Sequence, residues 1–363
     1  MRFPEFTEGW KRKRFKDVCN ITTGNKNTQD KSDDGIYPFY VRSQIVERIN
    51  SWTFDGEAIL TAGDGVGVGK VFHYSTGKIG VHQRVYILSD FKCDGKYLYS
   101  YFAGNFYNRV KRMSAKNSVD SVRMEMIADM PISLPSNEEQ KKIGHLLALL
   151  DERIATQNKI IEDLKILKSA IIERAYSNRS CHSCRIGDVI EQISERNKDK
   201  SIDMVLSVSN KQGFINQSEQ FEDRIIASED TSNYKIVHKN DFAYNPARIN
   251  VGSIARLTTI DTGIVSPMYI CFRVKNGVET EYMEHFFSTS YFFYEMQKRL
   301  EGSVRQCLSF EGICNIPIYI PSSEEQHRIG KNISVLLDKI DVESCYLSKL
   351  EEQKQYLLRH MFI

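Results

Sequence analysis

Apolar residues recur at spacings of three, four and seven along two stretches of the chain, residues 137–177 and the residues that follow Ile320. These spacings are typical of a helix that buries one face along its whole length. A helix over residues 137–177 would be roughly 60 Å long at 1.5 Å per residue, which is longer than a compact core needs. We therefore predict two long helices that pack together through a shared apolar seam. The seam positions are Ile143, Leu147, Leu150, Ile154, Ile161, Leu164, Ile171, Ile329, Ile333, Leu336, Ile340, Leu347, Leu350 and Leu357.

The two helical stretches are copies of one motif. The sequence LPSNEEQKKIG returns 186 positions later as IPSSEEQHRIG. Each copy begins with a capping box, in which Ser136 or Ser322 accepts bonds from free helix N–H groups while Glu139 or Glu325 reaches back. The stretch EEQK occurs at residues 138–141 and again at 351–354 and contains E-x-K, a fragment of some nuclease sites. Both copies lie on the predicted long helices with no upstream Asp on a strand, so we read them as solvated helix faces.

Polar residues interrupt both seams at matched positions. Gln157 corresponds to Glu343, and Lys168 corresponds to Lys354. An antiparallel pair, with one helix from each repeat, accounts for the length, the seam and these matched interruptions.

The segments before each long helix read as mixed domains. Runs such as KVFHYS, RVYILS and PMYICFRV predict short strands, and FYNRVKRM resembles FYEMQKRL, which indicates one amphipathic helix near the end of each domain. We predict an α+β fold of two similar domains, each followed by a long helix, with the helices packed as an antiparallel coiled coil of pseudo-twofold symmetry. The predicted limits are 1–133 for the first domain, 134–180 for the central helix and linker, 181–319 for the second domain and 320–363 for the C-terminal helix.

Charge is distributed unevenly between the two domains. The chain of 363 residues has a net charge of only +2, but residues 1–133 hold 20 Lys and Arg against 15 Asp and Glu, and residues 181–319 hold 15 against 18. Any contact with nucleic acid must therefore come from local patches.

Composition also bears on location and metal binding. No apolar run approaches the roughly 18 residues of a membrane span, and the first residues lack the apolar core of a secretory signal, so we expect a cytoplasmic protein. Eight scattered cysteines fit reduced thiols. The stretch CHSC at 181–184 has metal-ligand spacing but no second pair, so we predict no metal site.

The stretch LTAGDGVGVGKVFHY carries four glycines on alternate positions before Lys70. A phosphate-binding P-loop needs an earlier glycine where Asp64 stands and a hydroxyl where Val71 stands, and a helix should follow rather than a strand. We interpret the stretch as a turn feeding a hairpin, where glycines permit positive φ, with Lys70 and His73 beside it. The sequence NPAR lacks the second proline and the aromatic residue of an adenine methyltransferase motif, so we predict no catalytic residues.

The ordered double occurrence of domain and helix resembles the specificity (S) subunit of type I restriction-modification enzymes, over essentially the whole chain. The stretches NDFAYNPARINVGSIARLTTIDTGIVSPMYICFRV and AILTAGDGVGVGKVFHY are similar to segments of that family's target recognition domains. The resemblance implies that each domain reads one half of a split double-stranded DNA target and that the helices set the gap between the halves. It implies two modification subunits that methylate adenine, with restriction subunits as further partners. S-adenosylmethionine, ATP and Mg are expected on those partners and no cofactor on this chain.

Basic and amide side chains in matched loops are the candidates for DNA contact, because Arg and Lys suit guanine edges, Asn and Gln suit adenine, and all reach phosphates. The acidity of the second domain implies that it needs its partner subunits to bind DNA well. The candidates are Lys70, His73, Arg109, Lys111, Arg112, Lys116, Asn117, Tyr244, Asn245, Arg248, Asn250, Lys298, Arg299, Arg305 and Gln306.

Two other functions stay open on sequence grounds. One is a coiled-coil scaffold that joins protein partners without reading DNA. The other is an enzyme that binds a nucleotide through the Gly63–Lys70 loop.

Overall fold

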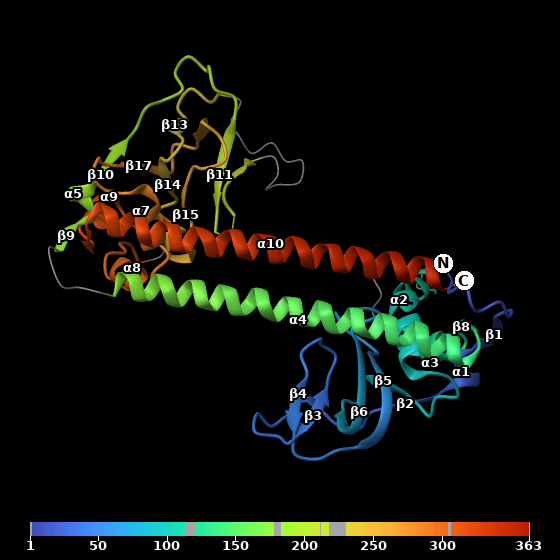
Figure 1. Cartoon of the computed structure of the whole chain (residues 1–363). Coiled ribbons are helices and arrows are strands. Elements are labelled where there is room, and N and C mark those ends of the chain that lie inside the picture. The colour runs from blue at the N-terminus through green and yellow to red at the C-terminus, as the bar shows by residue number, and fades with distance from the viewer. Residues whose placement is uncertain are drawn as a thin grey trace. The chain divides into compact units, whose positions relative to one another are not determined.

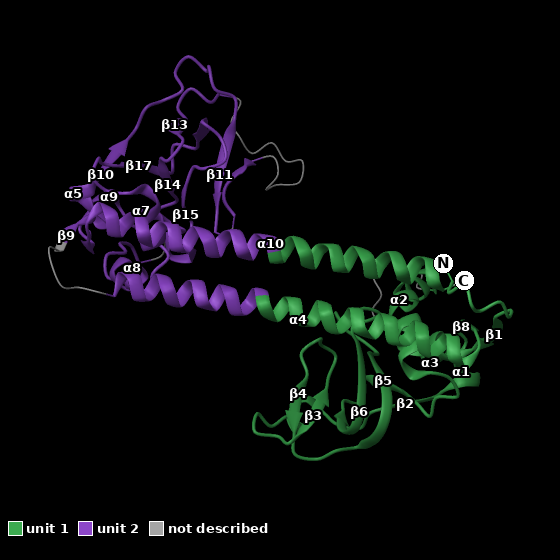
Figure 2. Cartoon of the chain, viewed as in Figure 1, with its two compact units in different colours: residues 1–160, 343–363 green, residues 161–342 purple. Residues whose placement is uncertain are grey.

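The computed structural model describes residues 2–113, 121–177, 183–210, 212–217, 230–303 and 306–362. The chain divides into two compact units, shown in two colours in Figure 2. Unit 1 comprises Met1–Ile160 and Glu343–Ile363, and unit 2 comprises Ile161–Val342. The units divide between residues 160 and 161 and between residues 342 and 343, within the two long helices. These positions do not test the domain limits expected from the sequence, which stay a prediction.

Unit 1 is built on a six-stranded sheet of order β2-β7-β5-β6-β3-β4 (Figure 1). All neighbours are antiparallel except β3 and β6, which run parallel. The six strands are β2 (Asn20–Thr23), β3 (Tyr37–Tyr40), β4 (Glu47–Ile49), β5 (Phe54–Ala62), β6 (Phe72–Val81) and β7 (Val85–Ser89). A separate pair joins β1 (Lys11–Arg14) to β8 (Pro131–Leu134).

The core of unit 1 is aromatic. Phe102 stacks on Phe106 with ring centroids 4.5 Å apart, and the edge of Phe72 meets Phe102 at 5.4 Å. Both stacked rings come from one face of a helix, because residues four positions apart lie on successive turns. The helices of this unit are η1 (Thr28–Asp30), α1 (Phe15–Val18), α2 (Gly95–Met113), α3 (Met124–Ala128) and parts of α4 (Asn137–Tyr176) and α10 (Ser323–Met361).

Unit 2 contains two four-stranded sheets, of order β10-β17-β14-β15 and β12-β11-β16-β13, and a two-stranded pair β18-β9. The strands are β9 (Ser183–Arg185), β10 (Ile190–Ile193), β11 (Val205–Ser209), β12 (Gly213–Asn216), β13 (Lys235–His238), β14 (Phe242–Tyr244), β15 (Ile254–Arg256), β16 (Thr262–Val265), β17 (Ile270–Val274) and β18 (Pro317–Tyr319). The short helices are α5 (Ile186–Val189), η2 (Ile249–Val251), α7 (Thr280–Phe286), α8 (Ser290–Gln297) and α9 (Phe310–Cys314).

The single amphipathic helix predicted near the end of the second domain is wrong, because the structure has two short helices there. Thr289 separates them: its hydroxyl donates to the carbonyl of Phe286 at 2.7 Å and accepts from the amide of Phe292 at 3.1 Å. This side chain ends α7 and caps the start of α8. In unit 1 the corresponding helix, α2, is continuous over 19 residues.

The duplication seen in the sequence is present in the fold. The strand order β2-β7-β5-β6 of unit 1 matches β10-β17-β14-β15 of unit 2, and all these pairings are antiparallel. Tyr97 donates a hydrogen bond to the carbonyl of Ser133 at 2.6 Å, and Tyr282 donates one to the carbonyl of Tyr319 at 2.8 Å. The α+β class and the two similar domains are therefore confirmed.

Half of each predicted capping box is confirmed. The Ser136 hydroxyl accepts from the amide of Glu139 at 3.4 Å, and Ser322 accepts from Glu325 at 3.3 Å. The reciprocal half is wrong for Glu139, whose carboxylate is fully buried and accepts two bonds from the Arg2 guanidinium at 2.8 and 2.7 Å. The reading of this stretch as a solvated face is wrong for Glu139 and for Gln140, which is also buried.

Gln140 fastens the start of α4 to the rest of unit 1. Its side-chain amide donates to the carbonyl of Pro135 at 2.8 Å, and its oxygen accepts from the amide of Asp94 at 3.0 Å. Gln326 makes both bonds again in unit 2, at 2.9 and 2.7 Å. We call these two side chains the glutamine brackets.

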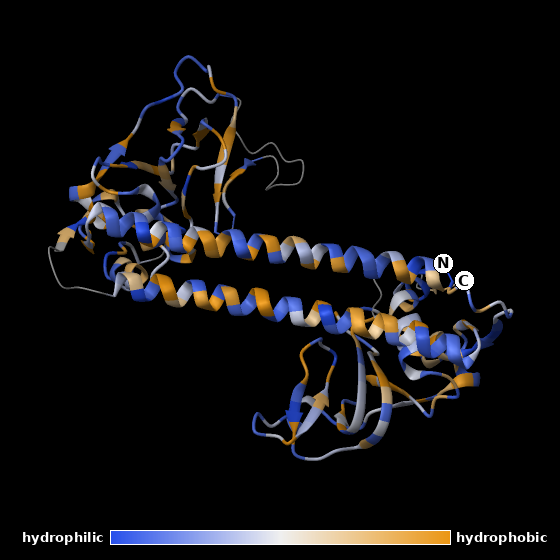
Figure 3. Ribbon diagram, in the orientation of Figure 1, coloured by the Kyte–Doolittle hydropathy of each residue, from blue (hydrophilic) through white to orange (hydrophobic). Residues whose placement is uncertain are grey.

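The long helices pack antiparallel where unit 1 holds both of them. Asp151 forms an ion pair with Lys354, and further along α4 the Gln157 amide donates to the carbonyl of Glu343 at 3.1 Å, so rising numbers in one helix meet falling numbers in the other. Figure 3 shows apolar and polar residues alternating along each helix. Eight of the predicted seam residues are buried and six are half-buried. The buried ones are Ile143, Leu147, Leu150, Ile161, Ile329, Ile333, Ile340 and Leu350, and the half-buried ones are Ile154, Leu164, Ile171, Leu336, Leu347 and Leu357.

The described cysteines are all free thiols in different surroundings. Burial raises the pKa of the Cys19 and Cys271 thiols to about 12, so neither forms the reactive thiolate at pH 8. Cys345 is exposed. We expect iodoacetamide at pH 8 to alkylate Cys345 in the folded protein and to reach Cys19 and Cys271 only after urea is added, as measured by mass spectrometry. Equal labelling of all three in the folded protein would contradict the assigned cores.

Among the described residues, no helix combines the length and the apolar character that crossing a membrane requires.

Candidate nucleic-acid interface

The glycine-rich stretch of unit 1 connects two paired strands. Its ends are held by β5 and β6, whose last pair is Thr61 with Phe72. Gly65 and Gly69 have φ of +80° and +66°, which side chains with a Cβ rarely adopt. The prediction of a hairpin turn followed by a strand is confirmed. We call residues 63–71 the first loop.

Backbone N–H groups of the first loop donate hydrogen bonds to carbonyl groups of the same loop. The amides of Lys70 and Val71 donate to the carbonyl of Gly67 at 3.0 and 2.9 Å, and the amide of Val68 donates to Gly65 at 3.1 Å. A phosphate cradle needs such N–H groups free and pointed at the ligand. The structure therefore gives no support to nucleotide binding by this loop.

Contacts at both ends hold the first loop in place. The amide of Gly63 donates to the carbonyl of Arg84 at 2.8 Å, and its carbonyl accepts from the amide of Val122 at 2.7 Å. Asp64 pairs with Arg42 at 2.8 Å and lies 3.6 Å from a guanidinium nitrogen of Arg84. A Cβ at Gly67 would lie 2.4 Å from the carbonyl oxygen of Arg42, so only glycine fits there.

Exposed cations surround this loop. Arg42 and Arg84 extend into solvent beyond their shared carboxylate, and Arg123 follows the Val122 amide that bonds the loop. Sequence reasoning missed these three arginines. No local signal marks them, because only the strand pairing and the Gly63–Val122 bond bring them to the loop.

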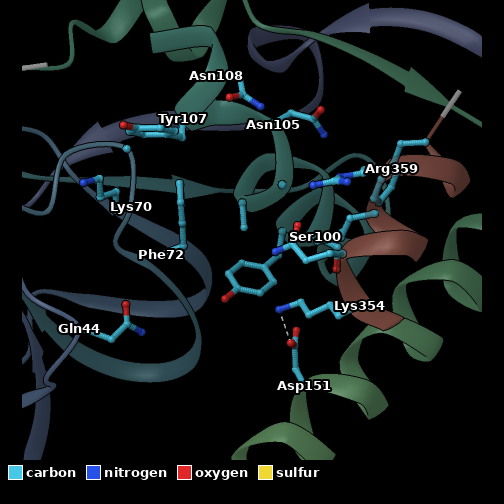
Figure 4. A pocket seen from close by; sticks show the side chains of 17 residues that line it. Gln44, Lys70, Phe72, Ser100, Asn105, Tyr107, Asn108, Asp151, Lys354 and Arg359 are labelled. Carbon is cyan, nitrogen blue, oxygen red and sulfur yellow. Dashed lines mark ion pairs between the residues drawn. The ribbon is translucent and has the colours of Figure 1, made fainter. Parts of the chain in front are cut away.

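A polar cleft of about 670 Å³ opens beside Lys70 within unit 1 (Figure 4). The first loop, α2 and the end of α10 line it, and Lys70 lies with its ammonium 5.6 Å from the centre of the Tyr107 ring. Lys354 and Arg359 add positive charge from α10, although Asp151 neutralises Lys354. Lys70 itself is exposed and forms no ion pair with an acidic side chain among the described residues.

The loop between β14 and β15, residues 245–253, occupies the matching position in unit 2. The Asn245 side chain accepts from the amide of Ala247 at 3.1 Å and shapes the turn, and Gly252 has φ of +92°. The amide of Leu308 donates to the carbonyl of Pro246 at 3.0 Å, as the amide of Val122 does to Gly63. We call residues 245–253 the second loop. Each unit thus presents one tethered loop at the same edge of the same four-stranded arrangement.

The second loop brings several predicted residues together. Arg248 and Asn250 are exposed on it, and exposed Gln306 lies two residues before Leu308. Tyr244 requires a correction, because it is fully buried and its hydroxyl donates to the carbonyl of Leu308 at 3.2 Å. It supports the loop from the core and cannot stack on a base.

Two predicted cations of unit 2, Lys298 and Arg299, share one carboxylate. Lys298 and Arg299 each lie 2.7 Å from an oxygen of Glu295, and the Lys298 ammonium lies 3.8 Å from the centre of the Tyr294 ring. These contacts hold the pKa of Glu295 below its usual value. Together the three side chains keep a net charge of +1, one less than the two cations alone.

The remaining candidates of unit 1 divide into supporting and exposed residues. Arg109 donates to the carbonyl of Met126 at 2.7 Å and ties α2 to α3. His73 contacts the carbonyl of Ser43 at 3.1 Å, and burial lowers its pKa, so it is not a cation for phosphate at neutral pH. Lys111 and Arg112 are exposed at the end of α2. Lys116, Asn117 and Arg305 lie outside the described residues.

The part of the chain that the structure describes contains no group of three or more His, Cys, Asp or Glu side chains placed to hold a metal. Cys181 of the CHSC stretch lies outside it. Cys184 lies on β9, and burial raises its pKa.

Comparison with known proteins adds to this geometry. A type I restriction modification DNA specificity domain matches residues 7–165 and again residues 181–352. The chain is 29% identical over 167 residues to the type I restriction enzyme EcoDI specificity subunit of Escherichia coli, a match that covers 45% of this chain and 37% of that protein. It is 21% identical over 398 aligned residues to the type I restriction enzyme MjaVIII specificity subunit of Methanocaldococcus jannaschii, covering 97% and 91% of the two chains.

Solved structures show the same fold. The S subunit of the type I restriction-modification system from M. genitalium aligns with a TM-score of 0.65 at 16% identity, over 99% of this chain and 97% of that one. A chain of a type I restriction-modification complex aligns with a TM-score of 0.57 at 12% identity. The resemblance read from the repeated motifs is confirmed. The chain therefore belongs to the family of type I restriction-modification DNA specificity proteins, with one specificity domain in each half of its sequence.

Proposed function

We propose that this chain reads a bipartite DNA target, with one half-site recognised by each specificity domain. One observation carries the proposal: the first and second loops occupy the same position in two equivalent sheets and are both exposed and tethered from beneath. Base edges are read by side chains held in fixed positions, so a tethered loop is suited to the task.

Catalysis in this family belongs to partner subunits rather than to the specificity protein. We propose that two modification subunits bind S-adenosylmethionine and methylate an adenine flipped out of each half-site, and that restriction subunits add cleavage driven by ATP and Mg. The second domain carries more acidic than basic residues, so we expect its half-site contacts to depend on those partners. A cytoplasmic location stays a prediction from the sequence.

The test is a map of methylated adenines in cells that express this chain with its modification subunit. We expect methylation at a split motif, and we expect replacement of the second domain by that of a relative to change only one half. A continuous motif, or a methylation pattern unchanged when this chain is deleted, would overturn the proposal.

Lys70→Ala is expected to weaken binding of the assembled methyltransferase to its target and to lower the salt dependence by about one phosphate contact. The matched control is Lys92→Ala. Lys92 is exposed and follows the C-terminal end of β7. The first loop lies at the opposite end of this strand, since Val85 pairs with Ala62, the last residue of β5. Affinity should be measured at several salt concentrations. Equal effects of the two substitutions would argue against a contact at Lys70.

A further inference from the structure

Val66 is an apolar side chain placed almost wholly in solvent. It is 99% exposed, the highest value among the large hydrophobic residues of the described chain. It sits at the tip of the first loop between Gly65 and Gly67, neither of which has a side chain to shield it. Single exposed hydrophobic residues are common on proteins, so exposure alone does not give this valine a role.

The backbone that carries Val66 is fixed. Gly67 lies against the Arg42 carbonyl too closely for any Cβ, and the base of the loop is bonded to Arg84 and Val122. The valine is therefore presented by a supported loop. A supported apolar tip is a feature that recognition uses.

The charge around the tip identifies its partner. Arg42 and Arg84 are 45% and 64% exposed, Lys70 is exposed, and Asp64 is the acidic residue that pairs with the two arginines. An apolar point within such a basic surface is complementary to DNA, in which phosphates flank the groove and the thymine methyl is the apolar feature of the major groove.

Unit 2 supplies an independent second case. Val251 lies on the second loop, at the matching place in the fold, and is 55% exposed. Asn250 precedes it and Gly252, with φ of +92°, follows it. Two loops of unrelated sequence thus each present a valine beside polar and basic residues.

We propose that Val66 is a specificity-determining residue that contacts the C5 methyl group of a thymine in the half-site read by the first domain. This inference rests on the proposed function. It names the base feature that the loop reads, and it assigns to Arg42, Arg84 and Lys70 the neighbouring phosphates.

The test is a double-substitution cycle with the assembled methyltransferase. Duplexes in which each thymine of the half-site is replaced in turn by uracil lack one methyl group and keep every hydrogen bond. For the unsubstituted protein we expect one such replacement to weaken binding about fourfold, the loss for one buried methyl group. For Val66→Ala we expect the same replacement to have no effect.

Two controls make the cycle specific. Ile36→Ala removes another exposed aliphatic side chain of unit 1, 66% exposed, and should leave the fourfold loss unchanged. Val251→Ala should leave the response to uracil in the first half-site unchanged. Each variant should also retain the unfolding midpoint of the unsubstituted protein.

Several outcomes would overturn the inference: a half-site without thymine, indifference of the unsubstituted protein to every uracil, or an undiminished fourfold loss in Val66→Ala. These outcomes are distinct from failure of the proposed function, in which the complex would show no bipartite target at all.

Discussion

Gly144→Ala is expected to lower the free energy of unfolding of unit 1 by about 2 kcal/mol. A Cβ at this position of α4 would lie 2.6 Å from a carboxylate oxygen of Asp94 and 2.7 Å from the amide nitrogen of Tyr97. Those two groups are hydrogen-bonded to each other at 2.8 Å, so neither can move without loss. Overpacking of this kind typically costs about 1–3 kcal/mol, and the upper end applies because one of the two clashing atoms belongs to the backbone. Subtracting the gain of about 1 kcal/mol from alanine in a helix leaves a net loss of about 2 kcal/mol.

The repeat provides a matched control for Gly144. Gly330 is the equivalent residue of α10, and a Cβ there would meet only the Cβ of Glu281, at an ordinary 3.5 Å. We expect Gly330→Ala to be neutral or to stabilise unit 2 by up to about 1 kcal/mol.

The two units can be followed separately in urea. Both tryptophans of the chain, Trp10 and Trp52, lie in unit 1, so their fluorescence reports that unit. Hydrogen exchange on the peptides of residues 183–210 and 230–303 reports unit 2. Destabilisation by both glycine substitutions alike would show that the two helix starts are packed equivalently, contrary to the structure.

The second large effect is expected from the glutamine brackets. Gln140→Leu keeps the approximate size of the side chain but leaves the Pro135 carbonyl and the Asp94 amide without their partner. Each unsatisfied group costs about 1–3 kcal/mol, so unit 1 should lose about 2–6 kcal/mol. Gln326→Leu should destabilise unit 2 by a similar amount.

The urea midpoint measured by tryptophan fluorescence, which reports unit 1, should therefore fall strongly for Gln140→Leu and little for Gln326→Leu. Gln355→Leu is the control, because this glutamine of α10 is exposed. A change of less than 0.5 kcal/mol in Gln140→Leu, within the range of an ordinary surface substitution, would show that the bracket does not hold the helix.

The parts of the fold that repeat in sequence could be predicted, because periodicity and duplication are properties of the chain itself. The start of α4, its end and the apolar seam follow from spacing, and Asn137–Tyr176 agrees with the predicted stretch within a residue. The role of Gln140 could not be predicted, because its partners lie at Pro135 and Asp94 and the second of these is remote in sequence. The break at Thr289 was missed because a threonine within an aromatic run gives a weak helix-stop signal.

The candidate site was predictable only in part. The first and second loops were identified from their composition, but their equivalence depends on strand order, which no local pattern encodes. Tyr244 illustrates the limit: an aromatic residue beside polar loop residues has the same sequence signature whether it faces DNA or the core. The arginines at positions 42 and 84 reach the first loop only through pairing of strands distant in the chain.

The division of the chain has a consequence for the order in which its parts can fold during synthesis. Unit 2 is one continuous stretch, whereas the core of unit 1 is completed by Met361 and by Phe362, whose ring packs 5.3 Å from Tyr97. The ribosome makes these residues only after it has made all of unit 2. N-terminal domains usually fold first during synthesis, but here unit 1 is completed only after unit 2 has been made. Completing unit 1 brings together two segments that are separated in the chain by the 182 residues of unit 2. A nascent chain halted before residue 343 therefore lacks the segment that completes unit 1.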